Sequence, residues 1–240
     1  MSPQASQKPA SGKKPSRSAK APREIKLSRT QAPDDWPAVE WQRGLRRQFG
    51  REQAFGLENI GGEPFFSEYR VSNPKSKSAY RVAIRGTQPG DNFCSCPDYA
   101  TNELGTCKHI EFTLAALEKK RGVKAAFARG YAPAFSEIHL RNDGRRSVHF
   151  RAGTTCPPAI EQAARALFEA ADHWRLPPAR FDALERFLGL VHKSGHELRA
   201  YDDALDFIAG CRDAERRAAL LAEHFPRGAA DGGLKKLLKV

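Results

Sequence analysis

The stretch FCSCPDYATNELGTCKHIEF, residues 93–112, gathers one histidine and three of the chain's 5 cysteines. Cys94 and Cys96 are two residues apart, and so are Cys107 and His109. We expect a cytosolic chain, in which thiols are kept reduced and an odd number of cysteines does not indicate a disulfide framework. Metal binding or catalysis is therefore the favoured use of this group.

The residues around the group predict a strand followed by a helix. Residues 92–96 (NFCSC) are typical of a short strand, which Pro97 ends. Residues 107–122 (CKHIEFTLAALEKKRG) carry apolar residues at helical spacing up to Gly122. The group therefore bridges the end of a strand and the start of a helix.

This arrangement lets four side chains share one ion. Cys94 and Cys96 face the same side of a strand, and both sulfurs reach one zinc if the strand curls at its end. Cys107 must lie just before the first helical turn and His109 inside it, because residues two apart point to opposite sides of a regular helix. Residues 97–106 form the loop that brings the second pair back to the first.

Four ligands without a nearby fifth candidate make a closed tetrahedral site, which is typical of structural zinc. Sulfur ligands favour zinc over magnesium or calcium. A nucleophilic Cys–His pair is the alternative, but no feature separates one of these cysteines from the other two. The remaining cysteines, Cys156 and Cys211, have no ligand-type neighbours and are predicted to be small apolar fillers.

Before this group the sequence predicts a helix and a hairpin. Residues 34–50 have Asp35 and Pro37 near the helix start and carry an apolar stripe at four-residue spacing. Residues 64–73 and 78–86 are rich in strand-forming residues and are separated by a turn.

After the group, residues 135–141 and 146–153 flank Asn142-Asp143-Gly144 and predict a second hairpin that is half buried. Three segments with helical periodicity follow, at residues 159–174, 178–195 and 201–225. His192, His196 and His224 lie on these segments or directly after one of them, without a set of partner ligands.

The fold class is therefore α+β, in which a small strand-strand-helix zinc finger follows an N-terminal helix and precedes a hairpin and a helical region.

The formal net charge is +12, and residues 1–30 contribute much of it because they hold eight Lys or Arg and only Glu24 as an acid. Such a segment cannot bury enough apolar surface to order itself. We expect a disordered basic tail at residues 1–33, a zinc-finger domain at 34–130 and a hairpin plus helical domain at 131–240.

The pattern C-x-C…C-x-H, written here as CSCPDYATNELGTCKHIEFTLAAL, resembles the SWIM zinc finger over residues 62–120. The Cys-Pro-Asp-aromatic and Cys-Lys-His-Ile words match that family. The resemblance implies a zinc finger with Cys94, Cys96, Cys107 and His109 as ligands. The chain also resembles, more weakly, the N-terminal region of bacterial Swi/Snf-type helicase-like ATPases. The resemblance implies binding to nucleic acid or to a partner protein.

Basic side chains around the predicted finger are candidates for phosphate contacts. They are Arg70, Lys75, Lys77, Arg81, Arg85, Lys119, Lys120 and Arg121. The partner is then nucleic acid, with DNA favoured over RNA, or a helicase-type ATPase core.

The sequence has no phosphate-binding loop, dinucleotide motif or H-E-x-x-H motif, so we expect no ATPase and no enzyme in this chain. The alternative is a fragment of a nucleic-acid enzyme, a transposase or nuclease, although no spaced acidic cluster indicates two-metal chemistry. No apolar run reaches the length of a membrane span, and no small-molecule substrate is evident. We expect a cytoplasmic protein, associated with the nucleoid if it is bacterial.

Overall fold

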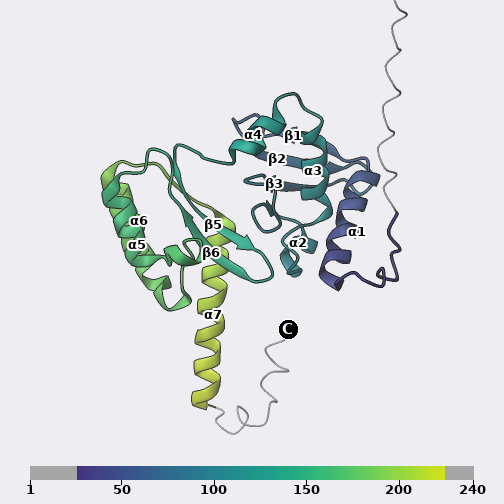
Figure 1. The fold of residues 1–240 in the computed structure, drawn as a ribbon. Coiled ribbons are helices and arrows are strands. Elements are labelled where there is room, and N and C mark those ends of the chain that lie inside the picture. Colours follow the sequence, from purple (N-terminus) through teal and green to yellow (C-terminus); the bar gives the residue numbers. More distant parts are fainter. Residues whose placement is uncertain (1–25, 225–240) are drawn as a thin grey trace, which may run out of the picture.

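The computed structural model describes residues 26–224, which form two sheets with helices packed against each (Figure 1). The α+β class predicted from the sequence is confirmed. We call residues 26–130 the first unit and residues 131–224 the second unit. Each unit has a hydrophobic cluster of its own.

The first unit contains a four-stranded antiparallel sheet in the order β1-β2-β3-β4. Its elements are α1 (Ala38–Glu52), β1 (Gly56–Asn59), β2 (Glu68–Asn73), β3 (Ser78–Ala83), β4 (Phe93–Cys94), α2 (Pro97–Thr101), α3 (Lys108–Glu118) and α4 (Val123–Arg129). The predicted hairpin is β2 and β3, and the predicted strand before Pro97 is β4.

Helix α3 lies between the sheet and α1. Tyr69 and Val71 alternate with exposed or half-buried neighbours along β2, and their buried side chains join those of Ile110 and Leu117 from α3. On the other side of α3, Gly50 of α1 approaches the α3 backbone so closely that a Cβ there would lie 2.8 Å from a carbonyl oxygen of α3. The helix that carries His109 is thereby fixed from two sides.

The predicted basic tail of residues 1–33 lies mostly outside the described residues. The prediction of disorder is wrong for the last part of this tail, because residues 26–31 lie along α1. The Leu27 N–H donates to Gln48 Oε1 at 2.7 Å, and the Trp41 indole N–H donates to the Ser28 carbonyl at 3.0 Å. Arg29 stacks over the Phe49 ring, so part of the apolar stripe of α1 is covered by this segment.

The second unit contains a three-stranded sheet in the order β6-β5-β7, in which β7 runs parallel to β5. Its elements are β5 (Ser136–Asn142), β6 (Arg146–Arg151), α5 (Pro158–Leu167), the 3-10 segments η1 (Ala170–Asp172) and η2 (Pro178–Ala183), α6 (Leu184–Ser194), β7 (Leu198–Ala200) and α7 (Asp202–His224). The second predicted hairpin is β5 and β6.

One face of this second sheet is apolar and the other is polar. Ile138 and Phe150 lie opposite each other and pack into the cluster formed with α5, α6 and α7. The alternate positions carry Glu137 and His139, which are also buried. The hairpin is therefore covered on both faces, whereas the sequence predicted one solvated face.

The predicted helix at residues 159–174 is too long. Helix α5 ends at Leu167, and Phe168 is extended. His173 and Trp174 have positive φ angles, and the Trp174 ring lies 5.7 Å from that of Phe150 on β6. Packing of the indole against the sheet therefore overrides the helical pattern of the sequence.

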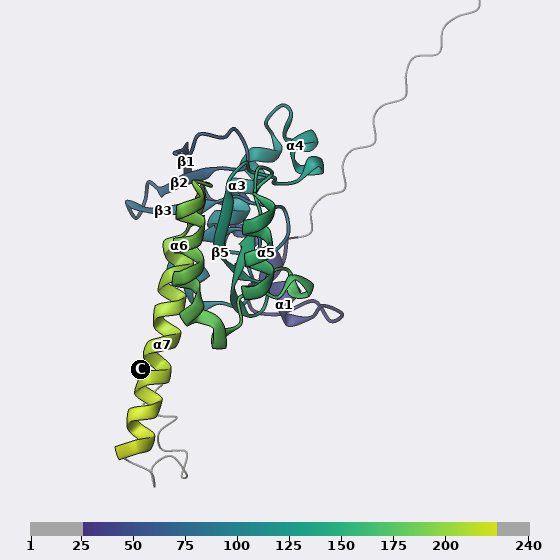
Figure 2. The ribbon, with the colours of Figure 1, turned by 90° about the vertical axis from the view of Figure 1, so that its left-hand side faces the viewer.

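Helix α7 begins against the second sheet and extends beyond the rest of the molecule in both ribbon views (Figures 1 and 2). Ala204 and Ile208 are buried near its start, whereas residues 212–220 are exposed. Within residues 26–224 no helix is both long enough and apolar enough to cross a membrane.

Candidate metal centre

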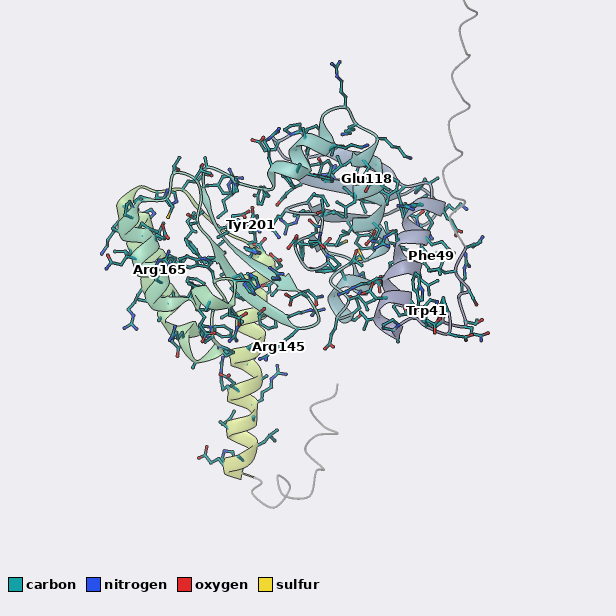
Figure 3. All side chains as sticks on the ribbon, viewed as in Figure 1. Trp41, Phe49, Glu118, Arg145, Arg165 and Tyr201 are labelled. Carbon is teal, nitrogen blue, oxygen red and sulfur yellow. The ribbon has the colours of Figure 1, made fainter. Side chains whose placement is uncertain are left out.

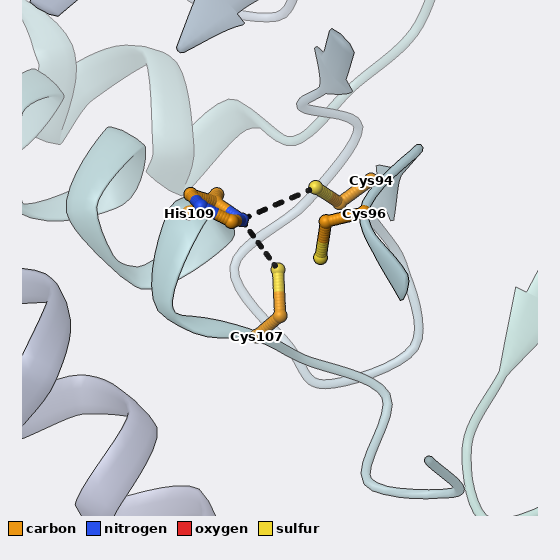
Figure 4. A group of neighbouring side chains, drawn as sticks. All are labelled: Cys94, Cys96, Cys107 and His109. Carbon is orange, nitrogen blue, oxygen red and sulfur yellow. Dashed lines mark hydrogen bonds between the residues drawn. The ribbon is translucent and has the colours of Figure 1, made fainter. Parts of the chain in front are cut away.

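The structure brings the four predicted ligands together. The sulfur atoms of Cys94, Cys96 and Cys107 and a ring nitrogen of His109 all lie within 4.8 Å of one another, and all four residues are buried (Figure 4). In the part of the chain that the structure describes, this is the one group of His, Cys, Asp and Glu side chains close enough to share a metal ion. All five cysteines are free thiols.

Strand and helix ends position the cysteines as the spacing predicted. Cys94 ends β4, and Cys96 is the N-cap of α2, where its sulfur accepts the Tyr99 N–H at 3.4 Å. Cys107 is the extended N-cap residue of α3, and His109 lies in the first turn of that helix. The positive end of the α3 dipole therefore faces a group of potential thiolates.

The imidazole of His109 points its Nδ1 at the sulfurs. Nδ1 lies 3.8 Å from Cys94 Sγ and 3.9 Å from Cys107 Sγ (Figure 4). A tetrahedral zinc with ordinary Zn–S and Zn–N bonds would hold these atoms about 3.6 Å apart. The ring is clamped between Phe55 and Tyr80, with centroids 5.1 Å and 4.8 Å away. These two aromatic residues fix the ring, and no motif in the sequence indicated them.

The loop between the two ligand pairs is held by both units. The Tyr99 hydroxyl donates to the Asn92 carbonyl at 2.6 Å, and Arg46 of α1 forms an ion pair with Asp98 at 2.7 Å. From the second unit, the Asn142 side chain donates to the Asn102 carbonyl at 3.1 Å. Part of the predicted loop forms α2, a short helix that the sequence did not predict.

Three buried thiols this close together cannot all ionise without a cation. Hydrogen bonding with Cys107 and Cys96, together with burial, raises the pKa of Cys94. Burial raises the pKa of Cys107, whereas hydrogen bonds from Cys107 and Cys94 lower the pKa of Cys96. A divalent cation would offset the repulsion between the thiolates, because it would stabilise all three of them at once.

The donor set fits a structural zinc ion. Three sulfurs and one imidazole nitrogen are soft or borderline ligands, and they close a four-coordinate site.

The remaining cysteines lie elsewhere. Cys156 and Cys211 are half buried and pack against the hydrophobic cluster of the second unit, as predicted for apolar fillers. His192 and His224 are exposed, and His196 Nε2 lies 2.8 Å from Ser136 Oγ.

Seven of the eight predicted phosphate-contacting residues fall into three places. Arg70 and Arg81 are neighbours on the outer face of the first sheet, where each forms an ion pair, with Glu58 at 3.0 Å and with Glu68 at 3.2 Å. Lys75 and Lys77 are exposed in the turn that follows β2.

The third group, residues 119–121, lies at the other end of β2. Lys119, Lys120 and Arg121 are exposed at the end of α3. The next residue, Gly122, lies against Phe65, which precedes β2. Lys75 and Lys77 lie at one end of β2 and residues 119–121 at the other, roughly 16 Å apart along the strand, so these two exposed groups do not form one continuous patch.

Arg85 does not belong to this surface. Its side chain is only 3% exposed, and its guanidinium Nε lies 3.7 Å from Glu137, which is fully buried. The sequence indicated a basic residue near the finger. It did not indicate the ion-pair partner, Glu137, which lies in the second unit. The prediction that Arg85 contacts phosphate is wrong for this structure.

No protein-family model, no curated protein sequence and no solved structure matches the chain. The metal centre and the surface around it are therefore the features that indicate a function.

Proposed function

We propose that this chain is a zinc-binding module of the SWIM type that binds nucleic acid, with DNA favoured over RNA. The observation that carries the proposal is the buried group of Cys94, Cys96, Cys107 and His109. In this role the chain is the N-terminal part or an accessory of a Swi/Snf-type helicase-like ATPase, and the ATPase core is its protein partner.

The metal would be structural. All four donors are buried, and the group offers three thiols and one imidazole without a further ligand side chain in the described residues. The site joins β4, the start of α2 and the start of α3. Zinc would therefore hold the sheet to the helix that packs on it.

Nucleic-acid contact would come from exposed cations. Among the described residues, no ion pair involves Lys75, Lys77, Lys119, Lys120 or Arg121, so these charges are available to phosphates. Arg70 and Arg81 would first have to exchange Glu58 and Glu68 for phosphate oxygens. Contacts of this kind read charge and not sequence, so binding would be indifferent to base sequence and sensitive to salt.

A salt titration with duplex DNA tests the proposal. Each phosphate contact contributes a slope of roughly −0.9 to a log–log plot of affinity against salt. Replacing Lys119, Lys120 and Arg121 together by Gln should reduce the slope by up to about 3. The matched control replaces Arg212, Arg216 and Arg217 of α7, which are exposed but paired with aspartates.

Two outcomes would contradict nucleic-acid binding by the module. One is an unchanged slope in the Lys119, Lys120 and Arg121 variant. The other is affinity that vanishes entirely when residues 1–25 are deleted, because that basic segment alone would then bind. Either result would favour the ATPase core as the partner, and co-purification of the two proteins would test it.

A further inference from the structure

A cleft of about 1090 Å³ lies where the two units meet. Its walls come from residues 61–68 and the end of β3, from residues 126–135, and from Arg199 and Tyr201 next to β7. Tyr201 is labelled at this junction in Figure 3. The volume exceeds the roughly 300–1,000 Å³ typical of pockets for one small molecule, which suits a segment of a polymer.

Aromatic rings line much of the cleft. Phe65, Phe66, Tyr131 and Phe135 are all only partly buried there. Phe66 and Tyr131 lie with ring centroids 5.3 Å apart. The Arg199 guanidinium lies 3.5 Å from the centre of the Phe135 ring. Aromatic rings and stacked guanidinium groups are the surfaces on which unpaired bases stack.

The charges around the cleft suit an anion. Arg129 lines the cleft, is exposed and has no ion-pair partner among residues 26–224. Arg85 also lines it, but its charge is already paired with the buried Glu137 and adds nothing for a ligand. Of the two acids that line the cleft, Glu68 is paired with Arg81, and Glu63 is exposed.

More basic residues adjoin the mouth of the cleft. A side chain placed at Gly122 would lie 3.7 Å from the Phe65 ring, so the segment at residues 119–124, the turn before α4 and the start of that helix, borders the cleft wall. Lys119, Lys120 and Arg121 of the turn and Lys124 at the start of α4 are all exposed. Basic side chains thus lie beside the aromatic lining of the cleft.

We propose that this cleft binds unpaired nucleotides of single-stranded nucleic acid, with bases on the aromatic rings and phosphates on Arg129 and the segment at residues 119–124. The inference rests on the proposed function, that the chain binds nucleic acid, and specifies the form of nucleic acid and the place. Bases stacked in a duplex hide their faces and cannot use these rings, whereas unpaired bases can. The excess of basic side chains favours a polyanion over a neutral peptide.

The test compares a fluorescein-labelled oligothymidylate of about 15 nucleotides with a duplex of the same length, by anisotropy on the full metal-loaded chain. The oligothymidylate should bind at least tenfold more tightly. Phe135→Ala should weaken its binding roughly 5- to 100-fold, since alanine substitution removes one stacking surface. Arg129→Gln, which changes an exposed side chain and leaves the core intact, should reduce the salt slope by about 0.7.

Two variants away from the cleft serve as matched controls. Trp36→Ala removes a ring that is 45% exposed ahead of α1. Arg145→Gln removes an exposed cation in the turn between β5 and β6, at the opposite end of β5 from Phe135 (Figure 3). Both should bind oligothymidylate like the wild type. Cross-links from a thiothymidine-substituted oligonucleotide should map to residues 61–68 and 126–135.

Several results would overturn the inference. Equal affinity for both nucleic acids, or cleft variants that bind like the controls, would show that the cleft is not the binding site. Binding to the duplex would still support the proposed function. Cross-links confined to Lys75 and Lys77 would do the same. Absence of binding to either nucleic acid would contradict the proposed function as well. Slower hydrogen exchange in the cleft with an ATPase core, but not with oligothymidylate, would make it a protein-docking site instead.

Discussion

The guanidinium Nε of Arg85 lies 3.7 Å from a carboxylate oxygen of Glu137, and this buried ion pair joins the two units. Arg85 follows β3 of the first unit, and Glu137 lies on β5 of the second. The carboxylate also accepts hydrogen bonds from the hydroxyls of Tyr131 and Tyr201 at 2.8 Å and 2.7 Å, and from Arg151 at 3.1 Å. One buried anion therefore organises the junction.

Removing this anion should weaken the whole fold. Glu137→Gln leaves the Arg85 charge buried without its counter-charge, so we expect the free energy of unfolding to fall by roughly 3–5 kcal/mol. Urea denaturation followed by circular dichroism measures the loss. The control is Glu161→Gln, which breaks an exposed pair with Arg165 and should cost less than about 0.5 kcal/mol. Equal losses in the two variants would show that the junction contributes no more than a surface pair.

Metal analysis tests the zinc site directly. We expect one zinc ion per chain, because one group of four donors comes close enough to hold an ion in the described residues. Changing Cys94, Cys96 or Cys107 to Ser, or His109 to Ala, should release it. Elemental analysis of dialysed protein measures the content.

The two remaining cysteines provide matched controls for metal content. Cys156→Ser and Cys211→Ser change half-buried thiols that pack on the second hydrophobic cluster, and both variants should keep their zinc. Zinc-free wild-type protein, or metal lost from either control, is incompatible with the assigned ligands.

Chelation should loosen the first unit and the edge of the second. Structural zinc in comparable small sites contributes on the order of 10 kcal/mol to folding. Removal of the metal by a strong chelator should therefore speed hydrogen exchange in residues 62–120. The turn at Asn142 should also lose protection, because its side chain bonds to the ligand loop. Helices α5 and α6 should stay protected, and equal protection of residues 62–120 with and without metal would contradict a structural role.

Local spacing was enough to predict the metal centre, whereas contacts between distant segments were not predictable. The positions of Cys96 before Pro97 and of Cys107 at a helix start follow from neighbouring residues, so the four ligands could be assigned from the sequence. The burial of Arg85 depends on Glu137, which lies 52 residues further along the chain. No periodicity in either segment indicates such a pair.

The elements that the sequence did not predict are short or weakly buried. Strand β1 has only one half-buried position, Leu57, among exposed ones, so it lacks the alternation of a covered strand. Strand β7 is three residues long and pairs with β5 across a separation of more than sixty residues. Helix α2 did carry a signal, since Pro97 occupies its first position after the cap at Cys96.

The close backbone approach at Gly105 gives a further test of the junction. Gly105 has a φ of +73°, and a Cβ there would lie 2.2 Å from the Asn142 carbonyl oxygen. Gly105→Ala should lower the free energy of unfolding by about 2–4 kcal/mol through strain and displacement of β5. Gly195→Ala is the matched control, because Gly195 has a φ of +72° in open space. Its cost should be about 1 kcal/mol, and an equal cost at Gly105 would exclude a tight junction there.

The buried His139 predicts a loss of stability in mild acid. Burial holds the pKa of His139 well below its ordinary value, and the charge of Arg85 lowers it further; Arg151, His149 and Arg141 also face the ring and act in the same direction. The unfolded chain binds a proton near pH 6.5, whereas the folded chain does so only at lower pH. The free energy of unfolding therefore falls as the pH drops below about 6.5.

Replacing the ring isolates this contribution. In His139→Gln the slope of unfolding free energy against pH, between about pH 5 and 6.5, should decrease by up to roughly 1.4 kcal/mol per pH unit, the value for one proton. Comparison with the wild type at equal zinc concentration cancels any acid release of the metal. His192→Gln changes an exposed ring and should leave the slope unchanged. Parallel curves for His139→Gln and the wild type would mean that His139 takes up its proton without unfolding, and that the junction opens to water in acid.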